Sequence, residues 1–115
     1  MNKEILKHTT KYEDELIEDL RDSEEAQAYL EEALKVYDED GDIQALLLAM
    51  RDVAEAQGGV GQLAKRMHRS RQYLYDVFAY KPQLDNLLDI LSGLGFRIRL
   101  ERKEVTTERA PVAMR

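Results

Sequence analysis

Residues 61–78, GQLAKRMHRSRQYLYDVF, contain two short helical patterns separated by only a tight turn. The first pattern runs over about 60–67, with Ala64 at the point where a following helix would have to cross close by. Ser70 is a favourable N-cap residue for the second pattern. The apolar stripes of the two patterns consist of Leu63, Ala64 and Met67, and of Leu74, Val77 and Phe78. The stretch therefore predicts two packed helices joined by a tight turn.

Amphipathic patterns on both sides of this stretch predict three further helices. The first covers about 23–37, after a possible capping box of Asp22 and Glu25. The second follows Asp42 as N-cap and ends at Gly58 and Gly59. The third has Pro82 in its first turn and ends at Gly93 and Gly95. With the two central helices, the chain is expected to be all-α with five helices.

A different periodicity follows the last helix, because Phe96, Ile98 and Leu100 alternate with charged residues. A period of two residues is typical of a strand with one buried face. A lone strand needs a partner for its backbone, so we expect two copies to pair across a two-fold axis as a homodimer. The alternative is that residues 96–103 extend the last helix or lie along the surface.

The expected organisation is an N-terminal arm at 1–21, the helical domain with its strand at 22–104, and a flexible tail at 105–115. A chain of 115 residues is one domain. The absence of cysteine and the separation of its two histidines, His8 and His68, argue against a metal site, a cofactor or catalytic residues, so no enzyme activity is expected. The longest apolar run has six residues, 45–50, which predicts a cytoplasmic protein without a membrane span.

The net charge of −6 is unevenly distributed along the chain. Residues 1–59 carry 6 basic and 17 acidic residues, a net of −11. Residues 60–82 carry a net of +4, and residues 83–115 a net of +1. This division suggests an acidic surface for a basic partner and a small basic surface for phosphate. The alternative is that the acidic helices are simply solvated.

Residues 61–78 have the layout of a helix-turn-helix, in which the second helix enters the major groove of DNA. Arg71 can bind guanine and Gln72 can bind adenine, each through two hydrogen bonds. Asp76 either accepts from cytosine or pairs with Gln72 one turn earlier. The other expected DNA contacts, to phosphate or to a thymine methyl, are Lys65, Arg66, Arg69, Ser70, Tyr73, Tyr75 and Lys81. The alternative is a helical hairpin in an ordinary bundle.

The same stretch, followed by Pro82, Leu84, Leu87 and Leu88, resembles the lambda-repressor-like DNA-binding domains of the Xre/Cro type. Most of the chain is more narrowly similar to the HigA-like addiction-module antidote proteins, which are antitoxins of RelE/HigB-type toxins. The matching segments are Lys11 and Tyr12, the helix at 24–34, LLLAMRDVAEAQGGV at 46–60 and LDNLLDILSGLGFRIRL at 84–100. The family usually has glycine where this chain has His68, and a left-handed conformation there costs about 1 kcal/mol.

This resemblance implies an antitoxin of a type II toxin-antitoxin module that binds a small basic toxin and represses its own operon as a dimer. Its operator DNA should be an inverted repeat with half-sites about one helical turn apart. The expected toxin anchors are Tyr12, Leu16, Ile17, Leu20 and Tyr29, with Leu30 beside them. Tyr29, Leu30 and Leu34 could equally be core residues. Two alternative hypotheses remain. The protein is a stand-alone prophage-type regulator without a toxin, or it is a toxin-binding protein whose helix-turn-helix no longer binds DNA.

Overall fold

In a computed structural model, residues 11–80 and 82–104 are described, and they form six helices and no strand. The helices are α2 (Lys11–Asp19), α3 (Ser23–Asp40), α4 (Ile43–Ala56), α5 (Val60–Met67), α6 (Arg71–Ala79) and α7 (Leu84–Leu94). The expected all-α class is confirmed for these residues. The expected number of five helices is corrected to six, because α2 forms within the segment expected to be an arm.

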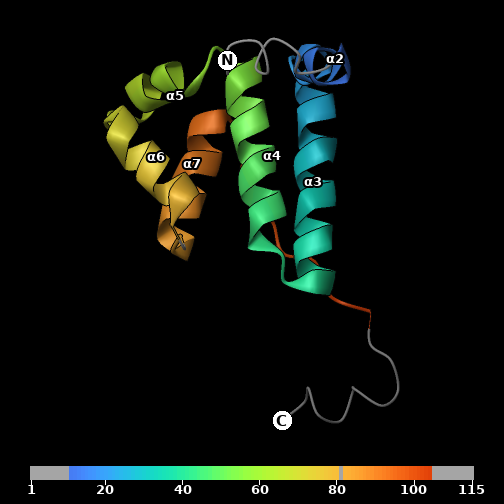
Figure 1. The fold of residues 1–115 in the computed structure, drawn as a ribbon. Coiled ribbons are helices and arrows are strands. Elements are labelled where there is room, and N and C mark those ends of the chain that lie inside the picture. The colour runs from blue at the N-terminus through green and yellow to red at the C-terminus, as the bar shows by residue number, and fades with distance from the viewer. Residues whose placement is uncertain (1–10, 81, 105–115) are drawn as a thin grey trace.

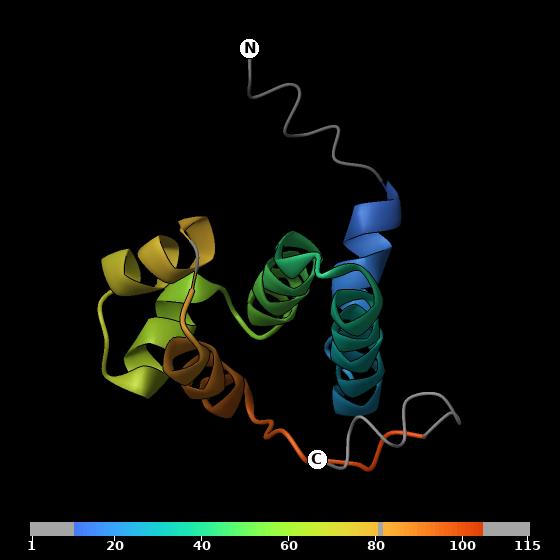
Figure 2. The ribbon, with the colours of Figure 1, turned by 90° about the horizontal axis from the view of Figure 1, so that it is seen from below.

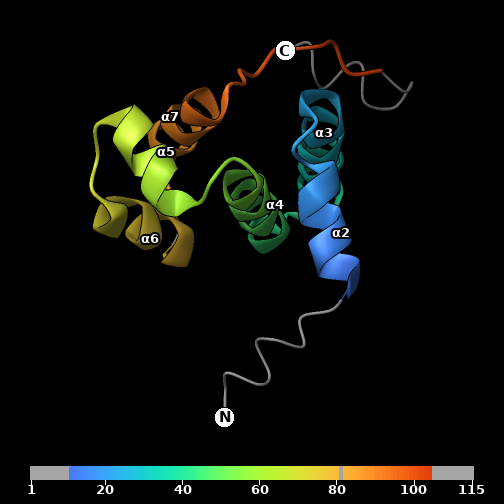
Figure 3. The ribbon, with the colours of Figure 1, turned by 90° about the horizontal axis from the view of Figure 1, so that it is seen from above.

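Helix α4 is the centre of the fold and contacts all five other helices (Figure 1). It pairs side by side with α3 on one flank, while α5, α6 and α7 lie on the other flank (Figures 2 and 3). Its position follows from its sequence, since it has the longest apolar run of the chain and buries six side chains. These are Leu46, Leu47, Ala49, Met50, Val53 and Ala54.

Side-chain caps begin three of the helices. Asp22 Oδ1 accepts from the Glu24 N–H at 2.8 Å, and Asp42 Oδ1 accepts from the Gln44 N–H at 3.0 Å. Ser70 Oγ accepts from the Tyr73 N–H at 3.0 Å. Each bond satisfies a backbone donor that has no partner within its own helix. Helix α3 extends three residues beyond its expected end at Tyr37, so α3 and α4 are separated by only two residues.

Both ends of α7 differ from the expectation. Pro82 lies outside the helix, because Gln83 is the N-cap residue and Leu84 is the first helical residue. Gly93 lies inside α7, and Gly95 alone closes it in a left-handed conformation, with φ of 99°. The Gly95 N–H bonds back to the carbonyl oxygens of Leu91 and Ser92. Such a closure satisfies carbonyl groups that the last turn leaves without partners.

The expected strand at 96–103 is not formed in the single chain. Residues 96–104 have no regular structure and lead from α7 toward α3 (Figures 2 and 3). Phe96 packs against the core, whereas Ile98 and Leu100 are 43% and 95% exposed. The physical reason is that a strand needs a neighbouring strand for its hydrogen bonds, and no other described segment is extended.

None of the helices in the described ranges is both long and apolar enough to cross a membrane.

Candidate nucleic-acid interface

Helices α5 and α6, with residues 68–70 between them, form a unit that we name the α5–α6 unit (residues 60–79). His68 ends α5 in a left-handed conformation with φ of 58°, as expected at this position. The N–H of the next residue, Arg69, donates to the Ala64 carbonyl at 2.9 Å. Leu63 and Leu74 are fully buried between the helices, and Ala64 is only 4% exposed. The small turn and the small side chain therefore allow the two helices to pack closely.

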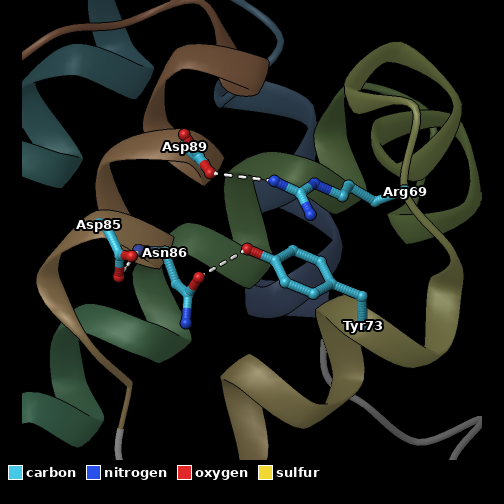
Figure 4. Close-up of polar contacts among 5 residues, drawn as sticks. All are labelled: Arg69, Tyr73, Asp85, Asn86 and Asp89. Carbon is cyan, nitrogen blue, oxygen red and sulfur yellow. Dashed lines mark hydrogen bonds and ion pairs between the residues drawn. The ribbon is translucent and has the colours of Figure 1, made fainter.

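Two residues expected to contact DNA also connect the α5–α6 unit to α7 (Figure 4). Arg69 Nη2 lies 3.4 Å from Asp89 Oδ2, and its guanidinium stacks over the Tyr73 ring at 4.7 Å from the centroid. The Tyr73 hydroxyl donates to Asn86 Oδ1 at 2.9 Å. These contacts orient the first turn of α6 against α7.

Arg66 makes a third connection between the unit and α7. Its Nε donates to the Gly93 carbonyl at 3.2 Å, and its Nη2 donates to Gln57 Oε1 at 2.7 Å. Gln57 Nε2 in turn donates to the Leu94 carbonyl at 2.9 Å. A guanidinium at the C-terminal end of a helix is favourable because the last carbonyl groups carry partial negative charge. Sequence reasoning missed this role, since the partners are far from Arg66 along the chain.

The outer face of α6 consists of exposed side chains. Arg71, Gln72, Tyr75 and Asp76 lie at helical spacings that place them on one side, and all four are exposed. Gln72 Nε2 donates to Asp76 Oδ1 at 2.9 Å, which is the pairing considered for Asp76 from the sequence. Arg71 and Tyr75 make no side-chain hydrogen bond or ion pair with another described residue.

A shallow hollow of about 460 Å³ lies beside this face, at the junction of α5 and α6. It brings together three of the expected basic residues, Lys65, Arg69 and Arg71. The Arg71 side chain lies over Gly61, where its Nε is 3.7 Å from the position that a Cβ atom would take. Lys81 lies outside the described residues. Of the three, Arg69 is already paired with Asp89, whereas Lys65 and Arg71 make no ion pair with another described residue.

The expected toxin anchors are spread between surface and core. Tyr12 is 71% exposed, and Leu16 and Ile17 are half-buried. Leu20 is 3% exposed and belongs to the core, so it is not available on the surface of the folded chain. The Tyr29 hydroxyl donates to Asp52 Oδ2 at 2.6 Å and ties α3 to α4. Burial first, and then this bond, raises the pKa of Tyr29 well above its ordinary value of 10.0.

Within residues 11–80 and 82–104, no three acidic, histidine or cysteine residues are grouped so that they could hold a metal ion. His68 lies in the turn of the α5–α6 unit, and His8 lies outside the described residues.

Comparison with known proteins gives one match. Residues 10–102 match the family described as "Probable addiction module antidote protein". No curated protein and no solved structure matches the chain significantly. The family match spans α2 to α7 and most of the segment that follows. The chain therefore belongs to the family of addiction module antidote proteins.

Proposed function

We propose that this protein is the antitoxin of a type II toxin-antitoxin module, neutralises a small basic RelE/HigB-like toxin, and represses its own operon by binding operator DNA. The observation that carries the proposal is the match of residues 10–102 to the antidote family. An antidote implies a toxin partner and a regulatory role without catalysis. The specific toxin and the repression are supported by the charge and exposure of the surfaces described above.

The DNA-binding part of the proposal assigns α6 as the recognition helix of a helix-turn-helix. Arg71 and Gln72 are exposed near its N-terminal end, where their side chains can reach base edges. To bind adenine, Gln72 gives up its exposed bond to Asp76, which contributes little in water. Lys65 is exposed on α5 and contributes a phosphate contact, whereas Arg66, Arg69 and Tyr73 position the helix.

The toxin-binding part of the proposal places the toxin on α2 and α3. Residues 11–42 contain 3 basic and 14 acidic residues, a net of −11. A basic toxin would be attracted to this surface, and electrostatic attraction mainly raises the rate of encounter. The exposed Tyr12 supplies an aromatic anchor, with the half-buried Leu16 and Ile17 beside it.

Repression requires two copies, because an acidic chain with one small basic surface binds DNA weakly by itself. We propose a homodimer formed through residues 96–103, which binds an inverted repeat with half-sites about one helical turn apart.

The first test is co-purification of the tagged protein from its native cells. We expect a small basic protein in near-equal amount. Recovery of the protein alone at low salt would contradict the antitoxin assignment and favour a stand-alone regulator.

The second test separates the two proposed surfaces. The variant Arg71→Ala with Gln72→Ala should lose binding to the operator in a gel-shift assay and still neutralise the toxin. Arg21→Ala with Gln44→Ala removes the same side-chain types from exposed positions outside the α5–α6 unit and should keep operator binding. Loss of both activities in the first variant would argue against separate surfaces.

A further inference from the structure

The segment that follows α7 makes almost no backbone hydrogen bond with the described part of the chain. The Phe96 N–H donates to the Leu91 carbonyl at 2.9 Å and completes the closure of α7. Beyond it, residues 97–104 make no hydrogen bond with any other described residue. Their side chains nevertheless keep the alternation of a strand, with Ile98 and Leu100 between charged neighbours. The segment thus presents donors and acceptors that a second strand could satisfy.

A groove of about 1080 Å³ lies beside this segment and is lined by residues of the segment and of α3. One side is formed by the segment itself, including Phe96, Ile98 and Leu100. The other side is formed by α3, where Leu30 and Leu34 form the apolar part of the wall. The groove therefore combines an open backbone edge with an apolar wall, as sites that take up an extended strand do.

The charges of the two sides indicate what the groove would take up. On the α3 side, Glu31, Glu32 and Asp38 outnumber Lys35. Residues 96–104, FRIRLERKE, carry four basic and two acidic residues, a net of +2. A second copy of this segment would therefore place an excess of basic side chains against the acidic α3 side, with Arg97, Arg99 and Glu101 of the first copy on the other side.

We propose that the groove between α3 and residues 96–101 binds residues 96–101 of a second copy. The two segments pair as antiparallel strands across a two-fold axis. The proposal deepens the dimer of the proposed repressor by giving it an interface. The strand absent from the single chain then forms only when two chains meet, because each segment supplies the other's missing hydrogen bonds.

The side chains select a register for this pair. With the axis at Arg99, Ile98 lies opposite the partner's Leu100 and Arg97 lies opposite the partner's Glu101. Each pairing occurs twice by symmetry, and apolar and opposite-charge pairs both stabilise neighbouring strands. The only like-charge pair is Arg99 with the partner's Arg99, on the axis itself.

The neighbouring registers are less favourable. With the axis at Ile98, Arg97 lies opposite the partner's Arg99 twice, and like charges directly opposite destabilise a sheet. With the axis at Leu100, Ile98 lies opposite the partner's Arg102 and loses its apolar partner. We therefore place the axis at Arg99.

Because the chain contains no cysteine, single substitutions can test the register in the full-length protein. Residues directly opposite in an antiparallel pair have Cα atoms about 4.5–5.5 Å apart, within the range that a disulfide spans. Arg99→Cys should therefore form a covalent dimer under mild oxidation. The cysteines of Ile98→Cys, or of Leu100→Cys, would be displaced from each other by about 7 Å along the strand direction. They should therefore cross-link on the order of tenfold more slowly. The readout is the dimer band on a non-reducing gel.

A charge exchange provides an independent measurement. Arg97→Glu places acidic residues opposite each other and should shift the protein toward monomer in analytical ultracentrifugation. Adding Glu101→Arg restores opposite charges and should restore the dimer. Arg21→Glu makes the same change in charge at an exposed position far from residues 96–104 along the chain, and it should leave the dimer intact. All of these positions are exposed, so circular dichroism should show folded helices throughout.

Two results would overturn the proposal: a wild-type protein that stays monomeric at high concentration, or fastest cross-linking at a position other than 99. None of the assays for the dimer contains toxin or DNA. Failure of the interface would therefore leave the antitoxin assignment standing, and a dimer of this register would persist if that assignment failed.

Discussion

At the scale of single residues, the turn of the α5–α6 unit depends on a backbone conformation that most side chains avoid. His68 has φ of 58°, and it is the only non-glycine residue with positive φ among the described residues. A Cβ atom in this conformation approaches the following carbonyl oxygen, which costs about 1–2 kcal/mol. The protein therefore tolerates a local strain at the point where its proposed recognition helix is positioned.

The variant His68→Gly should be more stable than the wild type by up to about 1 kcal/mol, since glycine adopts this conformation without the steric cost. His68→Ala should not gain stability, because alanine keeps the Cβ atom. The free energy of unfolding from urea titration would distinguish the variants. A His68→Gly variant less stable than the wild type would show that the imidazole makes a favourable contribution larger than the strain.

Tyr29 is a second residue whose environment has a measurable consequence. Burial and the bond to the Asp52 carboxylate raise the pKa of Tyr29 above 10.0, so the folded chain retains a proton that the unfolded chain releases. The contribution of Tyr29 to the free energy of unfolding should therefore be constant below pH 10.0. It should decrease as the pH rises above that value.

Tyr29→Phe should lose about 1 kcal/mol at neutral pH with the missing hydrogen bond, and should show a shallower loss above pH 10.0 than the wild type. Urea titrations at neutral and alkaline pH measure both effects. Tyr37→Phe, at an exposed site on the same helix, serves as the control. Equal alkaline slopes for wild type and Tyr29→Phe would refute this assignment.

At the scale of elements, α7 packs against α5 so closely that one position in the contact requires glycine. A Cβ atom at Gly93 would lie 2.7 Å from Met67 Cγ and 2.9 Å from Leu63 Cδ1. Leu63 is fully buried, so it has no free space into which it can move. Gly93 thus permits the close approach that also brings Arg66 to the end of α7.

Gly93→Ala should destabilise the protein by about 1–3 kcal/mol, although alanine favours the helix itself by about 1 kcal/mol. Met67→Ala in the same chain should reduce this penalty, because it removes the atom nearest to the new methyl group. Ser92→Ala, at the exposed neighbouring position, should have little effect. Additive effects of the Gly93 and Met67 substitutions on the urea midpoint would contradict a direct clash.

The elements that could be predicted from sequence are those determined by local patterns. Helix α5 has the expected bounds, and Ser70 begins α6, because periodic apolar residues and caps act within a few positions. Helix α2 was not expected, since its Leu16 and Ile17 become partly buried only against the rest of the fold. No strand forms at 96–103, because no other described segment offers it a partner.

The candidate site was predictable only where it depends on local helical spacing. The exposed face with Arg71 and Gln72 follows from helical spacing, and it is present. The roles of Arg66, Arg69 and Tyr73 were not predictable, because their partners on α7 lie 13 to 27 residues away along the chain. A basic or aromatic residue near a recognition helix gives no local sign of whether it binds phosphate or a neighbouring helix.

At the scale of the whole molecule, the acidic and basic surfaces lie on opposite flanks of α4. Helices α2 and α3 carry most of the acidic residues, whereas the α5–α6 unit carries four basic residues and one acidic residue (Figure 2). In the proposed complex with DNA, this separation would keep the acidic surface away from the phosphates and so limit repulsion.

This arrangement predicts different effects for two exposed basic residues. Lys65→Ala should weaken binding to all DNA sequences alike, and in a dimer it should reduce the slope of log K against log salt by about 2, one phosphate per copy. Arg71→Ala should instead reduce the preference for the operator over a mutated site by about 1–3 kcal/mol. Fluorescence anisotropy over a salt series measures both quantities. An unchanged salt slope for Lys65→Ala would remove it from the interface.

The polar contacts between the α5–α6 unit and α7 also affect which positions can change during evolution. Arg66, Arg69 and Tyr73 hold the recognition helix in place, whereas Arg71 and Tyr75 contribute nothing to those ties. The positions proposed to read bases are therefore free to change without loss of the scaffold. A library randomised at residues 71, 72 and 75 should fold in most of its members, and duplicated modules within one genome could acquire separate operators while keeping a common architecture.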